Sequence, residues 1–171
     1  EDVERLVTTS PYTAFLKIAE GCSNGCAFCV IPKLRGKYRS RSMEALLSEA
    51  EKLAASGVKE LIVIAQDITR YGLDLEEKAS LAQLVRELCR LDFHWIRLHY
   101  LYPEAVTGEL IDAIANEPKV LHYLDIPIQH CNDGILAKMR RRNTKAELVE
   151  LFAKLRAAMP DVVLRTSLIC G

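Results

Sequence analysis

The sequence carries no excess charge of either sign, because 23 lysines and arginines are balanced by 23 aspartates and glutamates. This balance removes any global electrostatic reason to expect a nucleic acid or a membrane as partner. The chain also lacks an apolar run near the roughly 20 residues that cross a bilayer, and we expect no signal peptide. It has no residue-level repeats and no low-complexity stretch, so a repeat architecture is not expected.

What remains is the composition of an ordinary globular domain. The 171 residues are 50% hydrophobic and 27% charged, which suits one domain with a real core. Six cysteines without a secretory signal favour reduced thiols in the cytoplasm over a disulfide scaffold. The chain starts without a methionine and stops at Cys170 and Gly171, directly after a strand-like run. We therefore expect residues 1–171 to be a piece of a longer protein.

One short loop carries the clearest chemical signal. Cys22, Cys26 and Cys29 follow one another with the spacing C-x3-C-x2-C. Gly21 and Gly25 allow the backbone to take positive φ angles, so the loop can curl and point three sulfurs at one object. Thiolates are soft ligands for zinc, copper(I) or iron–sulfur clusters. A four-iron cluster usually has four cysteines, so three thiolates would leave one iron open.

A zinc site and a set of buried structural cysteines are the alternatives for these thiols. Zinc usually takes four ligands, often as two C-x2-C pairs, and the sequence offers no second pair. Cys131 and Cys170 follow later strands, and either one as a fourth ligand would close the open iron. Cys89 lies in a helical pattern and is expected in the core.

Strand and helix patterns alternate along the chain. Continuous or alternating apolar runs predict strands at residues 13–19, 61–65, 94–100, 120–126 and 162–168. Apolar residues at spacings of three and four predict helices that begin after Ser42, Ser80, Thr107 and Thr144, with a short helix around residues 135–139. Gly57 is expected to end the first of these helices.

Alternating strands and helices predict a parallel α/β sheet with right-handed crossovers. Five strands are too few for a closed (β/α)8 barrel and favour an open, partial TIM-type barrel of the (β/α)6-like kind. In such folds the site gathers at the C-terminal ends of the strands. Polar segments do follow the strands: the cysteine loop, residues 66–72, 102–104 and 129–132.

The cysteine spacing, with Phe28 before the third cysteine, resembles that of the radical S-adenosylmethionine (radical SAM) enzymes. The resemblance implies a 4Fe-4S cluster on Cys22, Cys26 and Cys29, with S-adenosylmethionine bound to the fourth iron. One electron from the cluster would cleave the sulfonium and release a 5′-deoxyadenosyl radical. The ring of Phe28 would lie near the adenine. The fold implied is the same partial barrel.

Further segments resemble the methylthiotransferase family of that superfamily, which inserts a methylthio group at an unreactive C–H bond. They are Glu20-Gly21-Cys22, Ile31-Pro32, Arg35-Gly36, Ser40-Arg41, Gln66-Asp67, Tyr71-Gly72, Leu98-His99-Tyr100, Tyr102-Pro103 and residues 123–130. The best-known branches act on a tRNA adenosine or on an aspartate of a small-subunit ribosomal protein. Asp67 and His130 resemble the ribosomal-protein branch, since the tRNA branch usually has Asn and Ser there.

The resemblance also implies domains and partners. A full family protein adds an N-terminal domain with a second cluster and a C-terminal β-domain that helps to hold the substrate. Residues 1–171 would then be the central radical SAM core domain. The expected partners are a small-subunit ribosomal protein or the ribosome, and a reductant such as flavodoxin or ferredoxin. A tRNA methylthiotransferase is the first alternative, and a non-catalytic iron–sulfur electron carrier is the second, of a different class.

Three more side chains are predicted to contact the cofactor. Gln66 and Gln129 follow the second and fourth strands, where the superfamily places cofactor contacts, although polar loop residues often face only solvent. Arg165 lies inside the last strand, where a charge needs an anionic partner such as the cofactor carboxylate. A surface-facing Arg on an edge strand is the alternative. Asp125 is expected to point into the barrel, and His130 is a candidate proton relay or substrate contact.

Two basic segments are candidate RNA contacts. Alternating charges at residues 33–41 form a basic stripe, made of Lys33, Arg35, Lys37, Arg39 and Arg41, and residues 140–142 are three consecutive arginines. Either segment is suited to ribosomal RNA or to an acidic protein surface. Charge runs are more often plain solvated faces.

Overall fold

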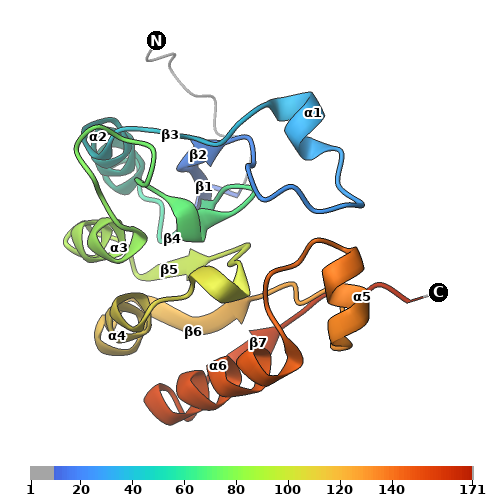
Figure 1. Ribbon diagram of the computed structural model, residues 1–171. Coiled ribbons are helices and arrows are strands. Elements are labelled where there is room, and N and C mark those ends of the chain that lie inside the picture. Colours follow the sequence, from blue (N-terminus) through green and yellow to red (C-terminus); the bar gives the residue numbers. More distant parts are fainter. Residues whose placement is uncertain (1–9, 171) are drawn as a thin grey trace.

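A computed structural model describes residues 10–170 and shows one open parallel sheet with helices packed against it (Figure 1). The strand order is β1-β4-β5-β6-β7. The strands are β1 Thr13–Lys17, β4 Glu60–Ile64, β5 Trp95–Leu98, β6 Val120–Asp125 and β7 Val163–Arg165. All neighbours pair in parallel, and within the described residues no pairing joins β1 to β7. The predicted partial barrel of five strands is confirmed.

Four longer helices connect the strands. They are α2 Met43–Ala55, α3 Leu81–Cys89, α4 Gly108–Asn116 and α6 Lys145–Ala158. The predicted caps are confirmed, because Ser42, Ser80, Thr107 and Thr144 each accept a backbone N–H of the first helical turn. Such a cap contributes about 1 kcal/mol to stability. Because it is formed by residues close together in the sequence, the sequence alone identifies it.

Short elements make the strand ends irregular. They are the helices α1 Ile31–Arg35 and α5 Asp133–Lys138, and the 3-10 turns η1 Ile68–Arg70 and η2 Pro103–Ala105. The predicted first strand is too long, because β2 Ala19–Glu20 leaves the sheet and pairs antiparallel with β3 Arg39–Ser40. The predicted last strand is also too long: β7 ends at Arg165, and only an isolated bridge from Gln129 to Leu168 follows.

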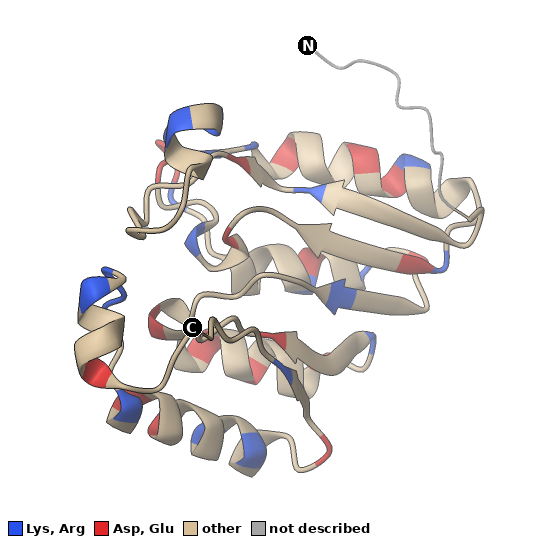
Figure 2. Ribbon diagram, turned by 90° about the vertical axis from the view of Figure 1, so that its right-hand side faces the viewer, with Lys and Arg blue, Asp and Glu red and all other residues tan. Residues whose placement is uncertain are grey.

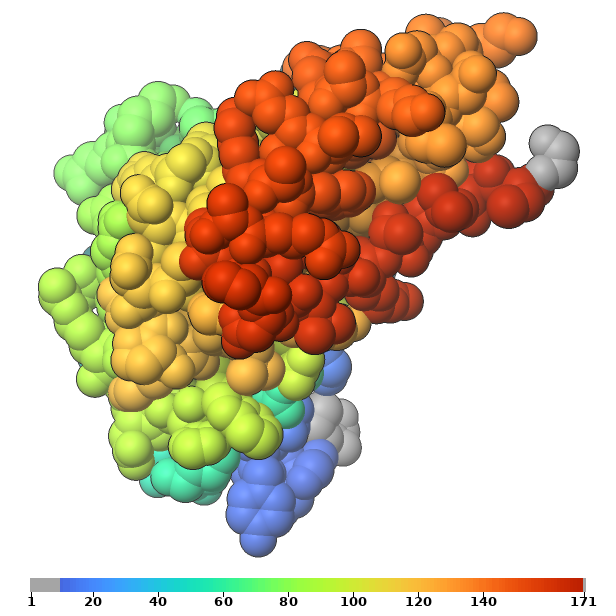
Figure 3. All heavy atoms as spheres, turned by 90° about the horizontal axis from the view of Figure 1, so that it is seen from below, coloured from blue at the N-terminus to red at the C-terminus, as the bar shows by residue number. Residues whose placement is uncertain are grey.

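The core lies between the helices and one face of the sheet. Leu16, Leu61, Ile96 and Leu98 alternate along their strands and are fully buried. The other face holds Phe15, Trp95, Arg97, Tyr123 and Arg165, and is only partly covered. Figure 3 shows α6 against the chain segment of α4, with the last described residues running past it. The half-open face lets residues from several strand ends share one site.

Candidate functional site

The cysteine loop connects β2 to α1 and turns on two glycines. Gly21 has φ 79° and Gly25 has φ 70°, both in the left-handed region. A Cβ at Gly21 would lie 2.3 Å from the carbonyl oxygen of Lys37, so no side chain fits there. The amide of Cys22 donates to the carbonyl of Gly36 at 3.2 Å and closes the base of the loop.

A buried carboxylate holds the middle of the loop. The side-chain amide of Asn24 donates to Oδ2 of Asp67 at 2.7 Å. Asp67 is fully buried; its Oδ1 accepts the amide and hydroxyl of Thr69, and Arg70 lies 3.3 Å away. The loop is thereby tied to the C-terminal end of β4. The amide of Ala27 donates to the carbonyl of Met139, which ties the loop to α5 as well.

The three loop thiols line one cavity of about 200 Å³. Its walls are Cys22, Cys26, Phe28, Cys29, Ile31, Gln66, Tyr100, Leu101, Tyr102, Pro127, Gln129 and Arg141. The strand ends therefore bring the three cysteines together with Phe28, Gln66 and Gln129, whereas Arg165, Asp125 and His130 do not line this cavity. Each of the three cysteines is half-buried, and burial raises the pKa of the Cys22 thiol. In residues 10–170, no three His, Cys, Asp or Glu side chains are grouped as around a single metal ion.

Cys26 has two partners that the sequence analysis missed. The Tyr102 hydroxyl lies 2.8 Å from its sulfur and shares a hydrogen bond with it. Nη1 of Arg141 lies 3.9 Å from the same sulfur, and the guanidinium stacks 3.8 Å above the Tyr102 ring. Burial and the bond to Cys26 raise the pKa of Tyr102, so the hydroxyl keeps its proton.

Arg141 corrects the reading of residues 140–142 as one exposed basic segment. It is 7% exposed, and its Nη2 donates to the carbonyl of Pro127 at 2.7 Å. Its Nε is buried and has no protein partner. A guanidinium with an unused donor, in the wall of this cavity, is suited to a carboxylate.

Gln66 and Gln129 lie in the cavity wall as predicted. Nε2 of Gln66 donates to Glu20 at 3.4 Å, while its Oε1 is buried and without a partner. Gln129 has φ 69°, an uncommon angle for a residue with a side chain. Its amide donates to the carbonyl of Ser167 at 2.9 Å, which fixes it beside the end of β7.

The anionic partner of Arg165 is a side chain of the protein itself. Nη1 of Arg165 donates to Oδ2 of Asp125 at 2.7 Å, and Arg165 does not line the cavity. Asp125 is fully buried and points to the inner face, as expected, with its Oδ1 unpaired. The role of Arg165 toward a cofactor stays a prediction. Cys89 is buried as expected.

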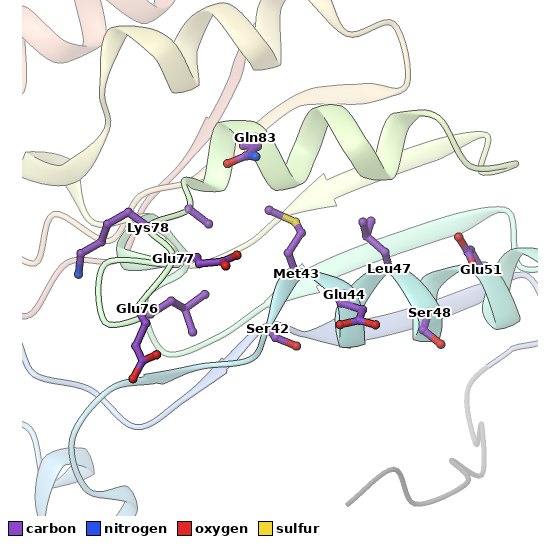
Figure 4. A pocket seen from close by; sticks show the side chains of 12 residues that line it. Ser42, Met43, Glu44, Leu47, Ser48, Glu51, Glu76, Glu77, Lys78 and Gln83 are labelled. Atoms are coloured by element: carbon purple, nitrogen blue, oxygen red, sulfur yellow. The ribbon is translucent and has the colours of Figure 1, made fainter.

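Other candidates lie outside this cavity. His130, Cys131 and Cys170 line a separate cavity. A larger cavity, of about 750 Å³ between α2 and residues 75–79, contains none of the predicted site residues (Figure 4). Basic residues on α1 and beyond α5 lie on one side of the molecule (Figure 2). Arg41 in the basic stripe is paired with Glu49 at 2.6 Å.

Residues 16–171 match the family model described as the radical SAM superfamily. The chain belongs to the radical SAM superfamily. It is 53% identical to the ribosomal protein uS12 methylthiotransferase RimO of Caldanaerobacter subterraneus, with all of this chain covered and 39% of that protein. It is 55% identical to the protein of the same name from Geobacter sulfurreducens, with 38% of that protein covered. The chain thus spans about two fifths of the curated relatives it matches.

Solved structures of the same superfamily share the fold. TsrM from Kitasatospora setae, a radical S-adenosylmethionine methyltransferase with cobalamin and a [4Fe-4S] cluster bound, matches with a TM-score of 0.69 at 19% identity. The match covers 93% of this chain and 31% of that one. OxsB, a cobalamin-dependent S-adenosylmethionine radical enzyme, also matches with a TM-score of 0.69, at 16% identity over 91% of this chain and 23% of that one. At such identities the likeness concerns the fold. Within the described part of the chain, no helix combines the length and apolar content needed to cross a bilayer.

Proposed function

We propose that this chain is the radical SAM core of a methylthiotransferase that modifies an aspartate of ribosomal protein uS12 in the cytoplasm. One observation carries the proposal: three soft thiol ligands and the unpaired polar atoms of Gln66 and Arg141 belong to one cavity at the strand ends. The similarity to proteins named uS12 methylthiotransferases supports the choice of substrate over tRNA.

The residues fit a cluster with S-adenosylmethionine. Cys22, Cys26 and Cys29 would hold a 4Fe-4S cluster with one iron left for the cofactor. When bound, these groups supply the one-electron cleavage of the sulfonium and the 5′-deoxyadenosyl radical. Arg141 has a donor for a carboxylate, and Gln66 has an acceptor for an ammonium or hydroxyl group.

The protein's own contribution is placement. Asp67 fixes the loop through Asn24, and Tyr102 fixes Cys26 through its hydroxyl. The half-exposed ring of Phe28 offers a flat apolar surface to an adenine. For the whole protein, the proposal also includes the remaining domains and an electron donor such as flavodoxin or ferredoxin. It further includes contacts of the basic stripe with RNA.

The first experiment measures cluster and cofactor cleavage. The protein is reconstituted anaerobically with iron and sulfide, and 5′-deoxyadenosine is measured after addition of dithionite and S-adenosylmethionine. We expect product from the wild type and from Cys89→Ala, the matched control, and loss of iron and product in Cys26→Ala. An intact cluster that gives no 5′-deoxyadenosine would contradict the proposal. An EPR signal unchanged by S-adenosylmethionine would favour an electron carrier.

The second experiment tests the substrate. The full-length protein that carries this chain is added to ribosomes from a strain lacking the activity, and peptides of uS12 and nucleosides of tRNA are analysed by mass spectrometry. We expect the methylthio group on a uS12 aspartate. Its appearance on a tRNA adenosine instead would assign the other branch.

A further inference from the structure

Arg165 and Asp125 form a charged pair on the inner face of the sheet, the face that the helices leave only partly covered. The two residues are register partners in the parallel pairing of β6 with β7, and Nη1 of Arg165 donates to Oδ2 of Asp125 at 2.7 Å. Asp125 is fully buried, whereas 53% of the Arg165 side chain is exposed. The buried carboxylate therefore fixes the guanidinium at a surface that another molecule can reach.

Arg165 has hydrogen-bond donors to spare. In the part of the chain that the structure describes, Asp125 is the one acceptor of the Arg165 side chain, and it uses a single nitrogen. Arg97 on the same face is more fully engaged, because its Nε donates to Glu60 at 2.7 Å and its guanidinium lies 5.0 Å from the centre of the Tyr123 ring. The unused nitrogens of Arg165 form a planar fork of N–H donors, which is the geometry that binds a carboxylate through both oxygens.

The pair lies next to the cavity of the loop thiols. Pro127 lines that cavity and follows Asp125 by two residues, so the backbone between them spans at most about 7 Å. The amide of Leu101, another residue of the cavity wall, donates to the carbonyl of Asp125 at 2.9 Å. Arg165 itself does not line the cavity. A group bound to Arg165 therefore lies beside the cavity and leaves the cavity to the cofactor.

We propose that Arg165 recognises the substrate: its unused nitrogens bind the side-chain carboxylate of the aspartate that is modified. This inference rests on the proposed function, in which that aspartate belongs to uS12. A carboxylate held beside the cavity brings the neighbouring C–H bond of the same aspartate close to the cavity. An asparagine in its place has no charge and only one acceptor oxygen, so the contact selects aspartate.

The test measures how well the full-length protein distinguishes aspartate from asparagine. Purified, fluorescently labelled uS12 is prepared in two forms, one with the aspartate that carries the methylthio group in the mass-spectrometric experiment and one with asparagine there. Fluorescence anisotropy gives the affinity of the reconstituted protein for each form, without turnover. We expect the wild type to bind the aspartate form at least about tenfold more tightly, as for a lost charge-assisted hydrogen bond. Arg165→Gln should bind both forms equally, to within about twofold.

Two further variants separate recognition from a purely structural role of Arg165. Arg165→Lys keeps the charge without the fork, so it should retain a preference of about threefold for aspartate. Arg156→Gln changes an exposed arginine on α6 and is the matched control, which should keep the wild-type preference. A structural role alone would weaken binding of both uS12 forms by the same factor.

The outcomes distinguish this inference from the proposed function. Equal affinity of the wild type for the two forms, or an undiminished preference in Arg165→Gln, would overturn the role of Arg165 while methylthiolation of uS12 stands. A methylthio group found on tRNA instead of uS12 would overturn the proposed function, and the role of Arg165 with it.

Discussion

The side-chain amide of Asn24 and the carboxylate of Asp67, 43 positions apart in sequence, meet at 2.7 Å inside the protein. The first lies between two cluster-binding candidates and the second at the end of β4. This bond connects the chemistry of the loop to the rigid sheet. Asp67 is also one of the residues by which the sequence resembles the ribosomal-protein branch. The same carboxylate therefore anchors the loop and distinguishes the branch.

Replacing Asp67 by Ala should destabilise the protein by about 3 kcal/mol, because it leaves Asn24, Thr69 and Arg70 with unpaired buried groups. Urea unfolding measures this change. Asn24→Ala removes only the link to the loop, so we expect a smaller loss of stability, about 1 kcal/mol, with a larger drop in iron bound after reconstitution. Equal iron content in Asn24→Ala and the wild type would contradict the anchoring role.

Tyr102→Phe removes the hydroxyl beside the sulfur of Cys26 and changes little else in volume. A hydrogen bond to a cluster sulfur stabilises the reduced, more negative state, so its loss should lower the reduction potential. For a bond worth about 1 kcal/mol the change is on the order of 40 mV. An EPR-monitored redox titration measures it. Iron content should stay at the wild-type value, and an unchanged potential would show that the hydroxyl does not reach the bound cluster.

Arg141 and Arg165 compete as the partner of the cofactor carboxylate. Arg141→Gln should weaken binding of S-adenosylmethionine by about 10- to 100-fold, as for a lost charge-assisted hydrogen bond. Arg165→Gln should change it by less than about threefold, because Arg165 is already paired with Asp125. Equilibrium dialysis with the reconstituted protein separates the two. The opposite order of effects would return the assignment to Arg165, and Arg141→Lys tests whether charge alone is sufficient.

His99 links stability to pH. Burial lowers its pKa below the ordinary value of 6.5. The unfolded chain therefore takes up the proton first as pH falls, so the contribution to stability is complete above 6.5 and decreases below it. His99→Gln should lose less unfolding free energy than the wild type between about pH 7.5 and pH 5.5. Urea titrations at both pH values measure this difference; identical losses would show that another group dominates.

The helices and strands were accessible from sequence because their signals are local. Thr144 and Glu147 form the predicted capping box within four residues, and the apolar run of β4 is continuous. The pair β2–β3 was missed, since two-residue strands leave no periodicity and their partners are far apart in sequence. The sequence predicts strands that extend too far at their C-terminal ends. Pairing with the neighbouring strand, and not composition, decides where β7 ends.

The site was predicted in part for a similar reason. Cysteine spacing is a compact motif, and residues after parallel strands must share one edge, so Gln66 and Gln129 could be placed. Arg141 could not, because three consecutive arginines resemble a solvated face and only folding buries the middle one. The one feature of the sequence that could have indicated the role of Arg141 is its position just after a short helix beyond the fourth strand.

Gly21 has no room for a side chain, and this makes it possible to change the arrangement of the three thiolates without changing their number. A methyl group at this position would push the passing chain at Lys37 away while every sulfur ligand stays in the sequence. The number of thiolate ligands and their positions in space can thus be changed independently in this protein. If metal capture depends on arrangement, a side chain at this single backbone position is enough to abolish it with all three cysteines present.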